Sequence, residues 1–325
     1  MKRPWSEFTG IESHSAVHAP RHVDPNELCD METWRKDERI RACGGHDPIR
    51  ITLAYAQDEL RYEDGEPINR FGLSYRRDAK FYLHKILADI TVAAATYLYQ
   101  TEGWTTVLYD GLRTVEGAYN LYVHASEDAM SSGLLSLPGT SAHNKGLAVD
   151  SMMVDSAGKE IEMGGHFDHP DMETNSRLYA GPNISEAAQM HRLIREVAFL
   201  RAALTQGLLI APLRPEFWDD RLPENREDLW RVLDSAARCM GLNLLTPEDE
   251  ALRKTDRAAF KAKWENWNYG EFLWQWKKTF EGREKELQQV LGVTAPPVEE
   301  RFEFYHGNYH PIYDSTLKAS GKNLT

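Results

Sequence analysis

Two long stretches of this chain place apolar residues at intervals of three or four, which is the spacing of an α-helix with one buried face. The first covers residues 78–100 and the second covers residues 183–204, where Asn183 is a candidate cap. A shorter stretch of the same kind covers residues 229–240. The sequence therefore predicts two long amphipathic helices and a third, shorter one.

Three other segments have the composition of β-strands. Residues 104–109 are rich in threonine, valine and aromatic residues and end at a turn, residues 146–154 follow a polar loop, and residues 272–276 alternate tryptophan or phenylalanine with other side chains. Strands and helices do not alternate regularly along the chain, which argues against a doubly wound parallel sheet. The expected fold class is α+β.

Charge and composition exclude several classes of partner. The chain has 325 residues, of which 42% are hydrophobic, and a net charge of -12, so neither nucleic acid nor an anionic membrane is an expected partner. No stretch approaches the roughly 18 to 20 apolar residues of a membrane span, and the first residues lack the apolar core of a secretory signal. Cys29, Cys43 and Cys239 form no CxxC pair, which is typical of reduced thiols in a cytoplasmic protein.

The densest chemical signal lies between Ser141 and Asp150, where His143 and Asp150 flank a turn at Gly146. Imidazole nitrogen and carboxylate oxygen are both good zinc ligands, and a catalytic zinc site needs three protein ligands and an open position for water. By spacing alone, a His and an Asp seven residues apart would ordinarily be a surface pair.

The string SxHxxGxAxD at residues 141–150 resembles the signature of the zinc D-alanyl-D-alanine dipeptidases, a family that includes the vancomycin-resistance dipeptidases. Further segments are similar to that family, namely residues 55–72, 81–85, 109–113 (YDGLR) and 163–168 (MGGHFD). The resemblance implies a Hedgehog/D,D-peptidase-like fold, a small antiparallel sheet flanked by helices. It also implies that His143 and Asp150 are ligands of one divalent metal ion, with zinc expected first and iron or manganese as alternatives.

The same resemblance assigns catalytic and substrate-binding roles. Arg113 is expected to stabilise the oxyanion, because a guanidinium offers paired donors. Glu265 is expected to act as general base and acid. The expected substrate-binding residues are Tyr109, Asp110, Ser141, Phe167 and Asp168.

The family pattern breaks at its ExxH motif, which reads Glu265-Asn-Trp-Asn268 here. An amide oxygen binds zinc less well than an imidazole does, so a changed affinity or metal preference is expected. Four interpretations stay open: Asn268 contributes its amide oxygen or holds a water; a histidine such as His166, His306 or His310 replaces it; metal and hydrolysis are both lost; or the register is misaligned. His166 and His169 are extra to the pattern and are ordinarily surface imidazoles.

Composition, periodicity and the resemblance together divide the chain. Residues 1–50 are expected to form an irregular arm, residues 51–293 a dipeptidase-like domain with an insertion at about 211–263, and residues 294–325 a tail. The expected function is metal-dependent hydrolysis of a small dipeptide-like or amino-acid-derived substrate, not necessarily D-alanyl-D-alanine. Two alternatives remain open: a non-catalytic or repurposed binding module on this scaffold, and a metal-dependent tailoring enzyme that acts on an amino-acid-like metabolite.

Overall fold

The structure is a computed structural model that describes residues 2–7, residues 22–167 apart from 63, 70 and 126–134, scattered positions in 185–202 and 248–259, and residues 310–324 apart from 323. The chain forms two compact units. The first consists of Met1–Ile161, Gly165–Asn175 and Tyr305–Thr325, and the second consists of Glu162–Gly164 and Ser176–Phe304. The helices and strands with assigned bounds belong to the first unit.

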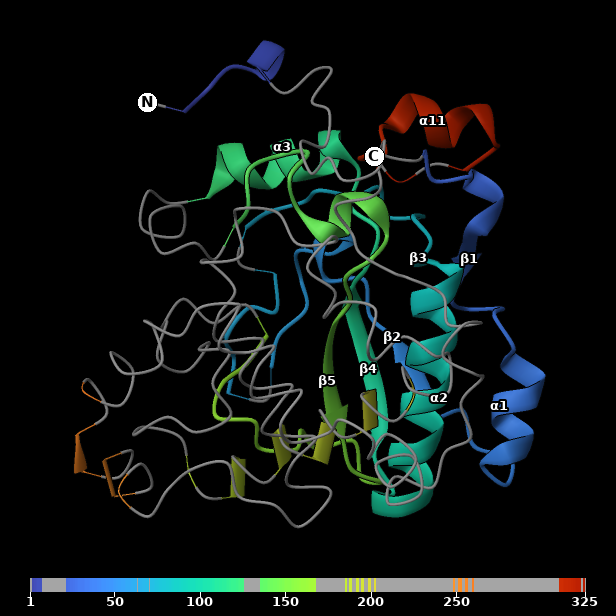
Figure 1. Cartoon of the computed structure of the whole chain (residues 1–325), viewed down its shortest axis with the longest axis vertical. Coiled ribbons are helices and arrows are strands. Elements are labelled where there is room, and N and C mark those ends of the chain that lie inside the picture. The colour runs from blue at the N-terminus through green and yellow to red at the C-terminus, as the bar shows by residue number, and fades with distance from the viewer. Residues whose placement is uncertain are drawn as a thin grey trace. The chain divides into compact units, whose positions relative to one another are not determined.

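A three-stranded sheet lies at the centre of the first unit. Its strands are β2 (Ile49–Ile51), β4 (Thr105–Asp110) and β5 (Asp150–Val154), in the order β2-β4-β5. Strand β4 pairs parallel with β2 and antiparallel with β5 (Figure 1). The strands expected at 104–109 and 146–154 are thus confirmed, but the second begins only at Asp150. The residues before it form a short 3-10 helix, η4 (Ala142–Lys145), and the turn that ends it.

A second sheet pairs β1 (Leu28–Asp30) antiparallel with β3 (Tyr82–His84). A helix of seven residues, α1 (Lys36–Ala42), and β2 follow β1 along the chain. The 3-10 helices η1 (Trp5–Glu7), η2 (Pro25–Glu27) and η3 (Ala54–Ala56) complete the amino-terminal part. Regular elements therefore occur between residues 25 and 51, where the sequence showed no sustained periodicity, because each element there is too short to display one.

Helix α2 (Lys85–Glu102) confirms the first predicted amphipathic helix, although it begins seven residues later than the pattern indicated. The reason is that Tyr82–His84 pairs with β1, so these residues are extended. The side chain of His84 caps the helix start by accepting a hydrogen bond from the Ile86 amide, and Gly103 ends the helix with a φ of 72°. The helix lies along β4 and buries Ala94 and Leu98 completely (Figure 1).

Two further helices lie close to the site described below: α3 (Val115–His124), capped by Thr114, and α11 (Asp314–Ala319). In the second unit, the described positions between 187 and 202 are helical, as expected for the predicted helix at 183–204. The predicted helix at 229–240 and strand at 272–276 lie outside the described residues. The described part is therefore mixed α and β, with small sheets and helices, which is compatible with the expected α+β class.

Among the described residues, no helix combines the length and the apolar character that a membrane span requires.

Candidate metal centre

An irregularity in the central sheet brings two carboxylates together. Residues of β4 and β5 pair regularly from Thr105 with Val154 to Leu108 with Ser151, and the next pair is Asp110 with Asp150. Tyr109 is therefore an extra residue on its strand, as in a β-bulge. Bulges re-aim side chains and are common beside functional sites. Here the bulge places Asp110 and Asp150 opposite each other at one end of the sheet.

The loop before β5 presents His143 to this end of the sheet. Ser141 caps η4 by accepting a hydrogen bond from the His143 amide at 3.2 Å. Gly146 ends η4 with a φ of 69°, a conformation that other residues rarely adopt. A Cβ atom at Gly146 would also lie 3.0 Å from the backbone nitrogen of His84, so the loop packs directly on β3. These local requirements fix the backbone that carries His143.

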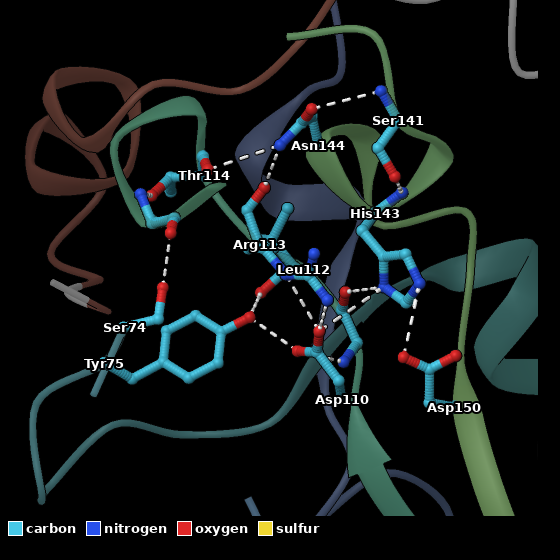
Figure 2. A network of polar contacts seen from close by, with 12 residues as sticks. Ser74, Tyr75, Asp110, Leu112, Arg113, Thr114, Ser141, His143, Asn144 and Asp150 are labelled. Carbon is cyan, nitrogen blue, oxygen red and sulfur yellow. Dashed lines mark hydrogen bonds and ion pairs between the residues drawn. The ribbon is translucent and has the colours of Figure 1, made fainter. Parts of the chain in front are cut away.

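The orientation of the His143 ring follows from its hydrogen bonds. Its Nδ1 atom lies 2.8 Å from the carbonyl oxygen of Gly111, which can only accept, so Nδ1 carries the proton in the neutral ring. The lone pair is then on Nε2, which lies 3.5 Å from Oδ2 of Asp150 (Figure 2). Backbone carbonyls commonly orient metal-binding histidines in this way. Burial lowers the pKa of His143, but Asp150 and Asp110 outweigh it, and the net pKa is raised.

Asp110 is fully buried and accepts hydrogen bonds on both carboxylate oxygens. Oδ1 accepts from the Tyr75 hydroxyl at 2.5 Å and from the Gly111 amide at 2.9 Å. Oδ2 accepts from Nε of Arg113 at 2.9 Å and also from Nη2 of Arg113. Figure 2 shows these donors around the Asp110 carboxylate. The buried ion pair fixes the Arg113 guanidinium beside His143.

Burial and these contacts change two pKa values. Desolvation, together with the neighbouring Asp110 carboxylate, raises the pKa of Tyr75 well above its ordinary value. Tyr75 is therefore a neutral hydrogen-bond donor. Desolvation lowers the pKa of Arg113, but Asp110 more than offsets this and the net pKa is raised, so the guanidinium stays charged. Asp110 and Arg113 thus form a charge pair within a buried part of the protein.

His143 and Asp150 have the donor chemistry and the spacing that a divalent metal ion requires. Two ligand atoms about 2.1 Å from zinc at the tetrahedral angle lie about 3.4 Å apart. The Nε2 to Oδ2 distance is 3.5 Å. Asp110 belongs to the same cluster, since one ligand atom from each of the three residues lies within 4.8 Å of the others. Its oxygens, however, already accept four hydrogen bonds, so we assign Asp110 a supporting role and regard His143 and Asp150 as the candidate ligands.

Three aromatic rings lie next to this cluster. Tyr109 stacks on Phe167 with ring centroids 5.1 Å apart, and Phe167 also contacts Tyr55 at 5.8 Å. The Arg113 guanidinium lies 5.4 Å from the centroid of the Tyr55 ring. Burial and the nearby Glu160 carboxylate raise the pKa of Tyr109 to about 12. A buried aromatic cluster and a fixed cation are therefore adjacent to the candidate ligands.

The structure brings together part of the predicted site. His143, Asp150, Asp110 and Arg113 converge as described, and Ser141 caps the loop that carries His143. Several expected residues lie outside the described part of the chain: Asp168, His169, Glu265, Asn268 and His306. Their assigned roles stay predictions.

The two described histidines that were considered as replacement ligands have other contacts. His166 lies 2.9 Å from Glu160 through Nδ1 and 2.9 Å from Asp64 through Nε2, and its ring stacks on Tyr62. His310 stacks on His22, with ring centroids 4.4 Å apart. Since both ring nitrogens of His166 already have carboxylate partners, His166 is poorly placed to complete the site.

Sequence reasoning did not identify Tyr75 or Asn144 as part of this network. Nothing in the local sequence marks Tyr75, which lies 35 positions from its partner Asp110. Asn144 is completely buried, and its side-chain amide donates to the Arg113 carbonyl at 2.8 Å. Its place directly after His143, in a loop of polar residues, was the one available signal.

Comparison with known proteins gives a distant relationship to one enzyme. No protein-family model matches the chain. The chain is similar to D-alanyl-D-alanine dipeptidase from Escherichia coli (strain K12), with 29% identity over 166 residues. The matched region covers 51% of this chain and 78% of the relative. This similarity agrees with the resemblance of the sequence motifs, at the level of a distant relationship over half of the chain.

Proposed function

We propose that the protein is a metal-dependent hydrolase that cleaves a dipeptide or a related small amide. One observation carries the proposal: Nε2 of His143 and Oδ2 of Asp150 lie 3.5 Å apart, with the tautomer of His143 fixed by the Gly111 carbonyl. The distant similarity to a dipeptidase supports the same class of reaction and suggests a dipeptide-like or amino-acid-derived substrate.

The proposed cofactor is one divalent metal ion held by His143, Asp150 and a third group. We propose Asn268 as that group, contributing its amide oxygen or a bound water. Zinc is the first expectation because imidazole and carboxylate both suit it. A ligand set with one nitrogen and otherwise oxygen also suits iron or manganese, so the metal that copurifies with the protein is informative.

Each residue of this site has a proposed part in the reaction. When bound, the metal ion polarises the scissile carbonyl and lowers the pKa of its water. Asp110 accepts hydrogen bonds from Nε and Nη2 of Arg113 and so orients the guanidinium beside His143. Arg113 is thus placed to donate to the oxygen that becomes negative during amide cleavage. Glu265 is the proposed acceptor of the water proton and its donor to the leaving amine.

The remaining expected residues contribute to substrate binding in this proposal. Tyr109 and Phe167 stack on each other and are almost completely buried, so we propose that they shape the wall of the substrate site. Ser141 and Asp168 are proposed polar contacts. Because Asp110 already accepts four hydrogen bonds, its part in substrate binding is indirect and acts through Arg113.

The test combines metal analysis with hydrolysis assays. Wild-type protein is expected to release amino acids from a panel of dipeptides that includes D-alanyl-D-alanine, and to lose this activity on treatment with a chelator. Glu265→Ala is expected to retain metal and lose hydrolysis. Full turnover in Glu265→Ala would refute the assigned base. Bound metal without hydrolysis of any dipeptide in the panel would refute the hydrolase and favour a binding module.

A further inference from the structure

The segment 310–324, part of the expected C-terminal tail, is built into the back of the site. The Ile312 amide donates to the carbonyl of Asn144 at 2.6 Å. The Ile312 carbonyl accepts from the amide of Val115 at 3.0 Å. The two backbone hydrogen bonds of Ile312 therefore connect the loop that carries His143 to the start of α3. Helix α3 directly follows the turn that contains Arg113.

The far end of the same segment reaches a third part of the network. The carbonyl of Leu324 accepts a hydrogen bond from the Arg76 amide at 2.7 Å, next to Tyr75. Between these attachments, Lys322 donates through Nζ to the Pro25 carbonyl at 3.0 Å. The segment is also anchored by three nearly or fully buried apolar side chains: Ile312, Leu317 and Leu324.

Asn144 is the junction between this segment and the site. Its side chain accepts from the Gly139 amide at 2.9 Å and donates to the Arg113 carbonyl at 2.8 Å. Its backbone carbonyl binds Ile312. In addition, the Arg113 amide donates to the His143 carbonyl at 2.9 Å. A shift of Ile312 would therefore be transmitted to the backbone of both His143 and Arg113.

We propose that the segment 310–324 is a positioning element for the metal centre and holds together the three backbone segments that carry Tyr75, Arg113 and His143. The effect of this segment on metal binding rests on the function proposed above. Sites that bind or catalyse need their groups held to within about 0.5 Å, so a support of this kind affects affinity before it affects overall folding. Ile312 acts on the site through the backbones of Asn144 and Val115 and is thus a positioning residue.

The test removes one hydrogen bond and compares the result with a matched loss of packing. Ile312→Pro deletes the donor to Asn144, whereas Leu317→Ala weakens the same segment without touching a bond to the site. Ile312→Ala keeps the amide and serves as the conservative variant. Zinc affinity is measured by chelator competition, and thermal unfolding shows whether the proline and Leu317 variants lose comparable stability.

Zinc affinity is expected to fall about 10-fold or more in Ile312→Pro, the size of effect seen when an outer support of a metal ligand is lost. Ile312→Ala and Leu317→Ala are expected to stay within about threefold of wild type. Equal zinc affinity in Ile312→Pro and Leu317→Ala would overturn the inference.

Amide hydrogen exchange of the metal-free protein separates this inference from the proposed function. Ile312→Pro is expected to accelerate exchange in residues 111–115 and 141–147, and Leu317→Ala is not. If the wild type binds no zinc, the proposed function fails, and these exchange rates still decide the positioning role. If Ile312→Pro does not fold, a variant that lacks residues 323–325 provides the test, because it removes the carbonyl that accepts from the Arg76 amide. This deletion should accelerate amide exchange at residues 74–76. Unchanged exchange there would contradict the inference.

Discussion

The hydroxyl of Tyr75 is expected to stabilise the protein through Asp110. It donates to Oδ1 of Asp110 at 2.5 Å, and both side chains are buried. Tyr75→Phe removes this donor and leaves the ring, so no cavity forms. Asp110 keeps its bonds from Gly111 and Arg113, which means that the carboxylate is under-satisfied but not isolated.

A hydrogen bond to a charged group contributes about 1.5 to 3 kcal/mol. Since Asp110 retains its other donors, we expect Tyr75→Phe to lower the free energy of unfolding by about 2 kcal/mol. With an unfolding entropy of about 2.1 cal/mol/K per residue, a chain of 325 residues shifts its Tm by about 1.5 °C per kcal/mol, so the Tm should fall by about 3 °C.

The assay is urea or thermal unfolding of Tyr75→Phe beside a matched control, Tyr99→Phe. Tyr99 lies half-buried on α2, and its hydroxyl has no hydrogen bond to another residue in the described part of the chain. The control is expected to stay within about 0.5 kcal/mol of wild type. Equal stability of the two variants would refute the central place of Asp110 in the network.

Three further predictions concern other parts of the first unit. Gly111→Ala places a Cβ atom 2.6 Å from the Phe81 ring and should lower the free energy of unfolding, measured in urea, by about 3 kcal/mol. The control Gly158→Ala has open space around the Cβ atom but a φ of 83°, and should lower it by about 1 kcal/mol. Equal losses in the two variants would contradict the close packing at Gly111. Burial and Asp89 raise the pKa of Cys29 from 9.0 to about 11, so its thiolate population is about 100-fold smaller than that of an ordinary thiol. Labelling of Cys29 with iodoacetamide at pH 8, followed by mass spectrometry, should therefore be slow until the protein is unfolded. Labelling of the native protein as fast as that of the unfolded protein would refute this. Burial raises the pKa of Glu116, so the folded protein binds this proton more tightly than the unfolded chain does, and the ionised carboxylate lowers stability above the folded pKa. Glu116→Gln should therefore have a urea midpoint equal to or higher than that of the wild type at pH 7, and should lose that advantage at pH 4. A lower midpoint at pH 7 would count against the burial argument.

The longer elements of the first unit were predictable because their patterns extend over several turns or residues. Helix α2 and strands β4 and β5 follow directly from periodicity and composition. The pairs β1 with β3 and β2 with β4 were not predictable, because strands of three residues carry almost no period. Their partners lie tens of residues away, so the pairing depends on packing that a local pattern does not contain.

The candidate site was predictable to a similar extent. The resemblance of residues 141–150 to the dipeptidase signature, and not their spacing alone, pointed to His143 and Asp150 as candidate ligands. The substrate-binding role expected for Asp110 stays a prediction, and the donors that surround its carboxylate, Tyr75 and Arg113, are known only from the structure. A bulge at Tyr109 sets this arrangement, and a shift of register by one residue is invisible in the sequence itself.

The attachment of residues 310–324 to the site is the feature furthest from what the sequence indicated. Ile312 lies 168 positions after Asn144 (312 − 144), and their contact is between backbone atoms, which no side-chain pattern records. The sequence marked this segment only as a tail outside the family resemblance. Its support of the site follows entirely from the hydrogen bonds of the folded chain.

Elemental analysis of purified protein tests the central claim most directly, with His143→Ala and the exposed α3 variant His124→Ala analysed in parallel. The account predicts stoichiometric zinc, iron or manganese in the wild type and in His124→Ala, and loss of that metal in His143→Ala. Absence of a bound metal from the wild type after dialysis against each of the three ions would contradict it, as would full metal content in His143→Ala.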